Sequence, residues 1–303
     1  MSIEENSYLS KIYKPYREEL CSKYSEAFNF FEEFNLFLHK EMTNINLKNN
    51  DSQGKVLVGL FIKSLSTFQA IVDLFRNYYC SDAKNLTRVL FEEMVNIGYC
   101  SKGEEELKRF GSLEIINRIK MIETVHKHFK KKDRDNYFKE KSYEEQKREY
   151  YNSLHNLKIK GLFSKKTNKP IPISIRKRIE RIEGTLESPV IMHYYNTFYR
   201  FASIETHSSP ESLGKYFHFD SKDNLIEIYW GPKAEKCSIA EIFFTSVEFM
   251  RIICGYLYDY FGIPKKEGID NFIKKSDVLS NKYLKYMDKE LIARIKTLKG
   301  ISN

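Results

Sequence analysis

The sequence contains few residues that interrupt helices. Among its 303 residues there are only 13 glycines and 7 prolines. These two residue types are the least favourable in a helix interior, so their scarcity favours long helices over a turn-rich β architecture. Hydrophobic residues make up 42% of the chain, enough to bury a substantial core in one large domain or two smaller ones. We therefore predict a mostly α fold, a multi-helix bundle.

The sequence also lacks paired cysteines and long apolar runs. No two of its five cysteines form a C-x-x-C pair (Cys21, Cys80, Cys100, Cys237 and Cys254). The longest apolar run, Val56–Ile62, stops at Lys63, far short of the roughly 20 residues that span a bilayer. The polar start of the chain, Met1–Glu5, has no apolar signal segment after it. We therefore predict a reduced, cytoplasmic protein without a membrane partner.

Motifs for nucleotides and metals are missing as well. Neither G-x-x-x-x-G-K-[ST] nor G-x-G-x-x-G occurs, which argues against a glycine loop that cradles phosphates. His126 and His128 are two residues apart and would point to different faces of a helix. The remaining histidines before position 200 and His218 lack carboxylate or cysteine partners at metal-ligand spacing. We expect no cofactor and no bound metal.

The net charge of +9 is concentrated in one segment. Between residues 127 and 183 there are 18 lysines and arginines against 8 aspartates and glutamates, so this segment accounts for the whole excess. Aromatic residues are interleaved with these charges and offer stacking surfaces beside phosphate-binding groups. One interpretation is an RNA-binding surface. The other is a solvated pair of lysine-rich helices whose aromatic residues pack inward.

Capping signals and breakers divide the chain into segments. We predict an N-terminal helical segment (1–54), a main helical domain (55–262) with a basic insertion at about 127–183, and a C-terminal helix (263–303). Within them we expect helices at about 15–38, with Pro15 in its first turn, at 55–79, and at 81–100, with Ser81 as its N-cap. The short connection between the last two predicts an antiparallel helical hairpin. Further helices are expected at 104–132 and 142–158, in a short basic segment that Gly184 ends, from 188 to about 207, and at 238–260 and 277–298. Ser142 and Glu145 form a capping-box pattern. Short hydrophobic runs around a polar turn predict a small β-hairpin at about 215–230.

A stripe of polar residues begins near position 199. Tyr199, Ser203 and His207 follow one another at spacings of four, and Arg200 lies seven residues before the histidine. On a helix these spacings place the side chains along one face. Ser208, Ser209 and Pro210 come next, so the helix should end near His207. Such a stripe must be solvated, internally satisfied or functional.

The pair Arg200 and His207 is similar to the motif of HEPN ribonucleases, small helical RNA-cutting domains with arginine and histidine separated by four to six residues. Histidine titrates near neutral pH and can move a proton. Arginine is permanently charged and can stabilise a phosphorane. The resemblance implies cleavage without a metal, and it implies a homodimer because HEPN sites are usually built across two copies. Arg200 would lean away from His207 on a regular helix, since side chains tilt toward the N-terminus.

A second pair, Arg88 and Glu92, lies one helical turn apart on an otherwise apolar helix. Together with Lys108–Phe110, Tyr199–Ser209 and Gly231-Pro232, the stretch Ala70–Glu93 resembles a bacterial family of helical domains of unknown function. Its members combine an R-x-x-x-E helix with a later Y-x-x-x-S-x-x-x-H motif. The likeness covers roughly residues 55–262. It points to five residues (Arg88, Glu92, Tyr199, Ser203 and His207) and, by analogy with HEPN domains, to a toxin or anti-phage role.

Two functions follow from these residues. In the first, the protein is an RNA endonuclease with His207 as general acid and base and with Arg200 or Arg88 as the phosphate clamp. In the second, it is a helical sensor or adaptor for a partner protein. There the Arg-Glu-Tyr-Ser-His set is a buried hydrogen-bond network without chemical activity. Exposure of His207 in a cleft would favour the nuclease, and its burial would favour the adaptor.

Overall fold

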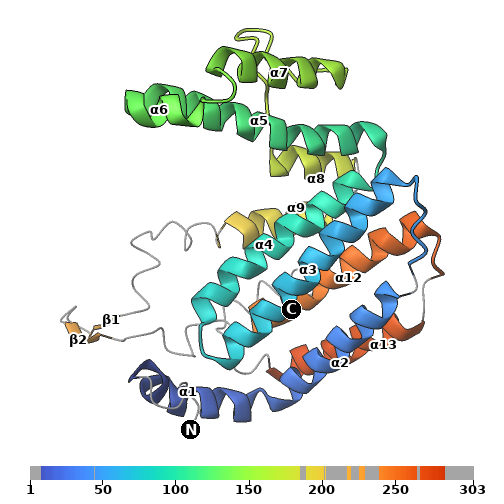
Figure 1. Ribbon diagram of the computed structural model, residues 1–303. Helices are drawn as coiled ribbons and strands as arrows, with labels where there is room; N and C mark the ends of the chain where they lie inside the picture. Colours follow the sequence, from blue (N-terminus) through green and yellow to red (C-terminus); the bar gives the residue numbers. More distant parts are fainter. Residues whose placement is uncertain are drawn as a thin grey trace. The chain divides into compact units, whose positions relative to one another are not determined.

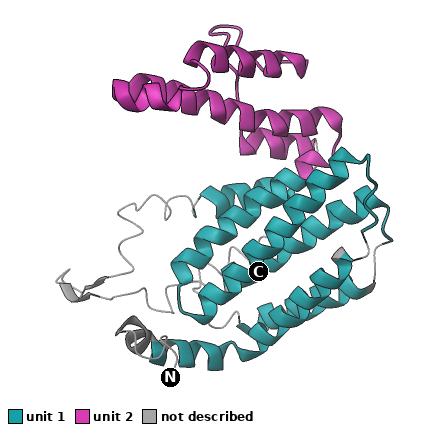
Figure 2. Ribbon diagram, in the orientation of Figure 1, with its two compact units in different colours: residues 1–97, 185–303 teal, residues 98–184 magenta. Residues whose placement is uncertain are grey.

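The computed structural model describes most of the chain and is mostly α-helical, as the composition predicts. The described residues are 8–43, 45–184, 189–200, 202, 217–219, 225–228, 239–264 and 267–283. The chain forms two compact units (Figure 2). The first unit consists of residues 1–97 and 185–303, and the second consists of residues 98–184. The basic segment at 127–183 lies in the second unit.

The first unit combines helices from both ends of the sequence (Figure 1). Its elements are α1 (Tyr8–Lys23), α2 (Ser25–Met42), α3 (Ser52–Arg76), α4 (Cys80–Cys100, which continues into the second unit), α9 (Val190–Tyr194), the π-helical turn η2 (Tyr195–Tyr199), α12 (Ile239–Phe261) and α13 (Glu267–Tyr283). α3 packs against both α2 and α12, and α13 packs against α2 and α12. The N- and C-terminal parts of the sequence therefore share one core.

Buried phenylalanines hold α2, α3 and α12 together. Phe31 of α2 stacks on Phe68 of α3, with ring centroids 4.5 Å apart, and meets Phe243 of α12 edge-on. Phe34 lies one turn further along α2 and also meets Phe68 edge-on. All four rings are at most 1% exposed. Burial of such a side chain contributes roughly 1.5–3 kcal/mol, so this cluster supplies a large share of the packing energy between the three helices.

α3 and α4 form the antiparallel helical hairpin that the sequence predicts. The connection Asn77–Tyr79 is short, and Tyr78 adopts a positive φ of 69°. Thr67 on α3 donates a hydrogen bond to Glu93 on α4, which fixes the register of the two helices. α4 begins at Cys80, so Ser81 lies inside the helix and the prediction of Ser81 as N-cap is wrong.

Within the described part of the chain, α3 is the one helix long and apolar enough to cross a membrane by length and composition. Core helices pass the same test. The side chains of Leu57, Phe61 and Phe68 on α3 are at most 1% exposed, because they pack against neighbouring helices. α3 is thus a core helix of the first unit.

The second unit contains α5 (Glu104–His128), α6 (Lys131–Tyr137), α7 (Tyr143–Asn156) and α8 (Ile175–Glu183). Its small hydrophobic core consists of Ile116, Ile119, Leu154 and Leu162. The predicted capping box is confirmed, because Ser142 accepts from the Glu145 backbone N–H and the Glu145 carboxylate accepts from the Ser142 N–H. Gly184 ends α8 with φ +60°, a conformation that favours glycine.

Several predicted helix boundaries are wrong. Pro15 lies inside α1 rather than in a first turn, and the predicted 15–38 helix divides at Tyr24 into α1 and α2. α5 continues through Gly111 but ends at Phe129, whose extended backbone separates it from α6. α13 begins at Glu267, ten residues before the predicted start. Local propensity leaves such boundaries open because tertiary packing decides where a helix ends.

The predicted hairpin is present as two short antiparallel strands, β1 (Phe217–Phe219) and β2 (Leu225–Ile228). Phe217 lies opposite Ile228, and His218 lies opposite Glu227. The register shifts after His218, where one residue is left out of the pairing. An isolated antiparallel bridge also joins Phe163 to Pro170 in the second unit.

Candidate functional site

A polar cluster joins α4 to the π-helical turn η2. On α4, Arg88 and Glu92 are one turn apart, and their closest charged atoms, Arg88 Nη2 and Glu92 Oε1, are 3.3 Å apart. The Tyr199 hydroxyl donates to Glu92 Oε1 at 2.8 Å and accepts from Arg88 Nη2 at 3.2 Å. The Tyr199 phenol therefore bridges the Arg88 guanidinium and the Glu92 carboxylate, which belong to a different helix. We call Arg88, Glu92 and Tyr199 the polar triad.

Aromatic contacts fix the ring of Tyr199. The Phe91 ring lies 5.2 Å away on α4, and the Tyr195 ring stacks on Tyr199 at 5.4 Å. The guanidinium carbon of Arg88 lies 4.9 Å from the centre of the Tyr199 ring, within cation–π distance. Arg88 thus contacts both the face and the hydroxyl of the same side chain. These contacts leave the phenol little freedom to rotate away from Glu92.

The helix that carries Tyr199 is not the regular α-helix that the spacing predicts. α9 covers only Val190–Tyr194, and the next turn, η2, is a π-helix. The Arg200 backbone N–H donates to the Tyr195 carbonyl, five residues earlier, instead of to the carbonyl four residues earlier. A π turn changes the direction of the side chains that follow it and is frequent at functional sites. Tyr199 is the last residue of this turn and contacts Arg88, Phe91 and Glu92 on α4.

Burial and charge set the protonation state of the polar triad. The side chains of Arg88 and Glu92 are 21% and 35% exposed, so the cluster is partly open to solvent. Arg88 Nε is buried and has no hydrogen-bond partner among the described residues. Burial raises the pKa of Tyr199; the hydrogen bond from Arg88 lowers this pKa, and the hydrogen bond to Glu92 raises it. Tyr199 is therefore a neutral hydrogen-bond donor at physiological pH.

The structure brings together three of the six residues that the sequence singles out, namely the polar triad. Arg200 follows Tyr199 directly and is exposed. Ser203 and His207 lie outside the described residues, and their place in the stripe stays a prediction. The sequence analysis did not select Phe91 and Tyr195, the rings that hold Tyr199. The available signal was their spacing, since Phe91 adjoins Glu92 and Tyr195 precedes Tyr199 by four residues.

A buried carboxylate on α4 also escaped the sequence analysis. Glu93 is 2% exposed, and its Oε1 accepts from the Thr67 hydroxyl at 3.2 Å. Lys63 Nζ lies 3.5 Å from the same oxygen, while Oε2 has no hydrogen-bond partner in the part of the chain that is described. Burial raises the pKa of Glu93 above its ordinary value of 4.5. The two adjacent glutamates thus have different surroundings: Glu92 belongs to the polar triad, whereas Glu93 is buried in the core.

No group of three or more histidine, cysteine, aspartate or glutamate side chains that could hold a metal ion occurs in the described ranges. The four cysteines among these residues are not disulfide-bonded, and burial raises the pKa of Cys100 and Cys254 to about 12. Neither thiol is a nucleophile at neutral pH, because the thiolate is the reactive form.

Comparisons with known proteins relate the chain to a family. A family model described as "Family of unknown function (DUF5677)" matches residues 54–225, more than half of the chain. The matched segment contains the polar triad together with Arg200, Ser203 and His207. No curated protein and no solved structure matches the chain significantly.

Proposed function

The chain belongs to the DUF5677 family of unknown function, and we propose that it is a HEPN-like, metal-independent RNA endonuclease. His207 acts as general acid and base, and an arginine clamps the phosphate. The observation that carries the proposal is the polar triad. It holds Tyr199, and with it the start of the Tyr199–His207 stripe, in a fixed position on α4.

The proposed reaction uses the RNA 2′-hydroxyl as nucleophile. His207 removes the proton from this hydroxyl, and the 2′-oxygen attacks the adjacent phosphorus. The bond from phosphorus to the 5′-oxygen breaks, and this leaving oxygen takes a proton from the histidine. The products are a 2′,3′-cyclic phosphate and a 5′-hydroxyl. A histidine near its ordinary pKa of about 6.5 suits both proton transfers, and a guanidinium stabilises the extra negative charge on the phosphorane.

The two arginines have different surroundings, which supports different roles. Arg88 is already balanced by Glu92 and bonded to Tyr199. Arg200 is exposed and makes no ion pair with a described residue. Binding of a phosphate by Arg88 would require competition with Glu92, whereas Arg200 has no such competitor in the described chain. We therefore assign the phosphate clamp to Arg200. Arg88, Glu92 and Tyr199 position the segment that carries Arg200, Ser203 and His207.

The wider proposal follows from the same resemblance. RNA would be held by the basic segment at 127–183, and two copies of the chain would form a homodimer, as is usual for HEPN sites. An RNA-cutting protein of this kind would act in the cytoplasm as a toxin or an anti-phage effector.

A second function is favoured by the charge balance within the polar triad. Because Arg88 and Glu92 neutralise each other, the triad can be a structural network that fixes η2 to α4. In that case the protein is a helical sensor or adaptor that binds a partner protein and cuts no RNA. The two functions differ in what removal of His207 does, since only the nuclease requires its imidazole.

The test is incubation of the purified protein with total cellular RNA in EDTA. We compare the wild type with His207→Ala, Arg200→Ala and the control His193→Ala, which removes a histidine from α9. The proposal expects cleavage by the wild type and the control, 2′,3′-cyclic phosphate ends, and loss of cleavage in the other two variants. Unchanged cleavage in His207→Ala would contradict it. Absence of cleavage by every folded variant would favour the adaptor.

A further inference from the structure

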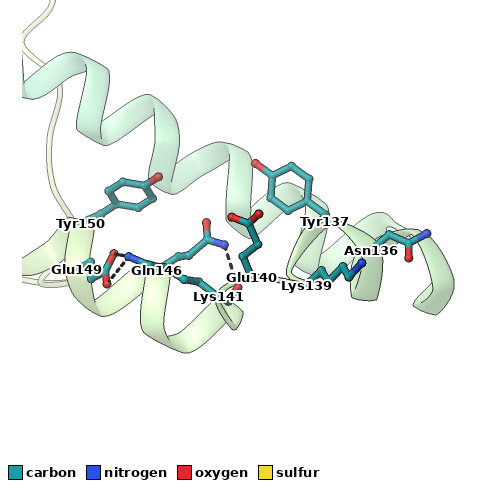
Figure 3. Close-up of a pocket in the computed structure, with 8 residues that line it drawn as sticks. All are labelled: Asn136, Tyr137, Lys139, Glu140, Lys141, Gln146, Glu149 and Tyr150. Carbon is teal, nitrogen blue, oxygen red and sulfur yellow. Dashed lines mark hydrogen bonds and ion pairs between the residues drawn. The ribbon is translucent and has the colours of Figure 1, made fainter.

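The second unit contains a hollow between the end of α6 and the first half of α7. Its volume is about 470 Å³, within the range of small-molecule sites. Eight residues line it: Asn136, Tyr137, Lys139, Glu140, Lys141, Gln146, Glu149 and Tyr150 (Figure 3). The lining therefore combines two phenol rings with amides, two ammonium groups and two carboxylates.

Part of this lining is held in place by its own hydrogen bonds. Lys141 Nζ lies 2.8 and 2.9 Å from the two carboxylate oxygens of Glu149. The Gln146 side chain donates to the Lys141 carbonyl at 2.9 Å. These bonds join the α6–α7 connection to α7, so the wall of the hollow has a defined shape without a ligand.

The two rings of the hollow are also anchored. Tyr137 is 42% exposed, and its ring meets Phe138 edge-on at 5.0 Å. Phe138 in turn meets Tyr143, which stacks on His126 of α5 at 4.0 Å. On the other side, Tyr150 packs against the hydrophobic core of the second unit. Tyr137 therefore presents an open face for stacking at low entropic cost, because its neighbours already restrict it.

Three polar side chains of the hollow are not engaged by the described residues. Lys139 and Glu140 are exposed and form no ion pair, and the side chain of Asn136 forms no hydrogen bond there. In Figure 3 the Glu140 carboxylate lies between Gln146 and Tyr137. The hollow thus offers a carboxylate acceptor next to an aromatic ring, with a cation nearby.

The surroundings of the hollow are strongly basic. Of the 18 lysines and arginines between residues 127 and 183, 15 are exposed. Lys130, Lys131 and Lys132 stand at the start of α6, the helix whose end supplies Asn136 and Tyr137. Those three lysines make no ion pair with a described residue. Such a surface attracts a polyanion, whose backbone would be drawn past the hollow.

We propose that the hollow binds an unpaired guanine base of single-stranded RNA. The inference rests on the proposed function for RNA as the substrate class. Unpaired RNA bases are recognised by stacking on aromatic side chains and by hydrogen bonds to their Watson–Crick edges. Tyr137 stacks on the base, and Lys139 contacts the adjoining phosphate.

Guanine fits because of Glu140. An ionised carboxylate only accepts hydrogen bonds. The Watson–Crick edge of guanine carries two adjacent donors, N1–H and the 2-amino group, which can bond to both carboxylate oxygens. Uracil presents one donor between two carbonyl acceptors, which would face the carboxylate unfavourably. The hollow therefore prefers guanine to uracil, and it excludes duplex RNA because paired bases have no free Watson–Crick edge.

The test measures binding of full-length His207→Ala protein in EDTA, so that RNA stays intact. Fluorescence anisotropy compares a uridine oligonucleotide with the same oligonucleotide carrying one central guanosine. We expect the guanosine to raise affinity about tenfold, as a good bidentate contact does. Glu140→Gln and Tyr137→Leu should abolish the preference, while Tyr137→Phe retains the ring and keeps it. Lys139→Gln should weaken both oligonucleotides equally.

Glu144→Gln is the matched control, because Glu144 is an exposed carboxylate of α7 that does not line the hollow. It should leave the guanine preference unchanged. Three results would overturn the inference. The wild type could bind the two oligonucleotides with equal affinity, or Glu144→Gln could lose the guanine preference as Glu140→Gln does. The protein could also bind anionic lipid vesicles in place of RNA. If the wild type cuts RNA without a guanine preference, only the hollow is misassigned. If the preference is present and His207 proves dispensable for cutting, only the nuclease proposal fails.

Discussion

The Tyr199 hydroxyl donates a hydrogen bond to Glu92 across 107 residues of sequence, with 2.8 Å between the two oxygens. It also accepts from Arg88, so one phenol completes an ion pair that belongs to another helix. The position of η2 on α4 depends on this contact and on the ring contacts of Tyr199. Any role of Arg200, Ser203 or His207 therefore depends on Tyr199, whose position is fixed by side chains of α4.

Replacement of Tyr199 by phenylalanine removes the bridging hydroxyl and keeps the ring. The cost should be about 1 kcal/mol of unfolding free energy, the usual net value of a hydrogen bond, and somewhat more because Glu92 is charged. Urea denaturation measures the loss. Tyr195→Phe is the control, because the Tyr195 ring stacks on Tyr199 and its hydroxyl makes no hydrogen bond with a described residue. A loss as large in the control would show that the bridge contributes nothing.

The pair Arg88 and Glu92 should be more strongly coupled than an ordinary surface pair. A double-mutant cycle with Arg88→Ala and Glu92→Ala measures the coupling energy. Arg118 and Glu114 on α5 form a matched pair at the same spacing, with both side chains more than half exposed. Exposed pairs of this kind couple by about 0.3–0.5 kcal/mol. The partly buried pair should exceed this range because Tyr199 bonds to both partners. Equal coupling in the two cycles would contradict the cooperative triad.

Glu93 should make stability depend on pH. Burial raises its folded-state pKa above 4.5, so the folded protein retains the proton more tightly than the unfolded chain does. The favourable contribution of the protonated carboxyl is complete below the unfolded pKa. It is lost as the pH rises through the folded pKa. Glu93→Gln cannot lose a proton, so its stability relative to the wild type should increase as the pH rises from about 4 to 7.

Chemical denaturation at several pH values measures this difference. Glu19→Gln, a substitution at an exposed glutamate of α1 that forms no ion pair with a described residue, is the control and should show a flat difference. A flat profile for Glu93→Gln as well would mean that Lys63 and Thr67 keep the carboxylate charged in the folded protein. In that case an ion pair between the exposed Lys63 and the buried Glu93, rather than a neutral carboxyl, would join α3 to α4.

The packing of α3 can be tested with one substitution at a buried position of the helix and one at an exposed position. Phe68→Ala removes a fully buried ring that contacts Phe31 and Phe34, and such changes cost about 3–5 kcal/mol. Ile62→Ala removes a side chain that is 48% exposed and should change stability by less than about 0.5 kcal/mol. Thermal or urea unfolding in water, without detergent, measures both. Similar costs at the two positions would mean that α3 is buried on all sides.

Local signals in the sequence predicted the presence of the helices better than the residues at which they begin and end. The capping box at Ser142 and the glycine at 184 depend on neighbouring residues, and both form as predicted. Pro15 failed as a helix start, because α1 already begins at Tyr8. The break at Phe129 was not predicted, since its extended backbone lies within a run of helix-favouring lysines. Packing and loop geometry decide these points, and neither is visible in a short stretch of sequence.

At the candidate site, too, the sequence predicted local features but not the contacts between helices. The spacing of Arg88 and Glu92 predicts that they share a helix face, and the hydroxyl of Tyr199 requires a polar partner when partly buried. No local pattern states that these three side chains meet. The π turn at η2, which carries Tyr199, also has no signal in the spacing of the polar residues.

The sequence by itself determined the helical class, the β-hairpin and the concentration of positive charge between 127 and 183. These properties follow from composition, periodicity and capping, which act over a few residues. The tertiary structure alone decided that Tyr199 completes the Arg88–Glu92 pair, that Glu93 is buried beside Thr67, and that Tyr137 and Glu140 line one hollow. Each of these depends on contacts between helices, because a side chain's burial and partners are set by which distant elements pack against it.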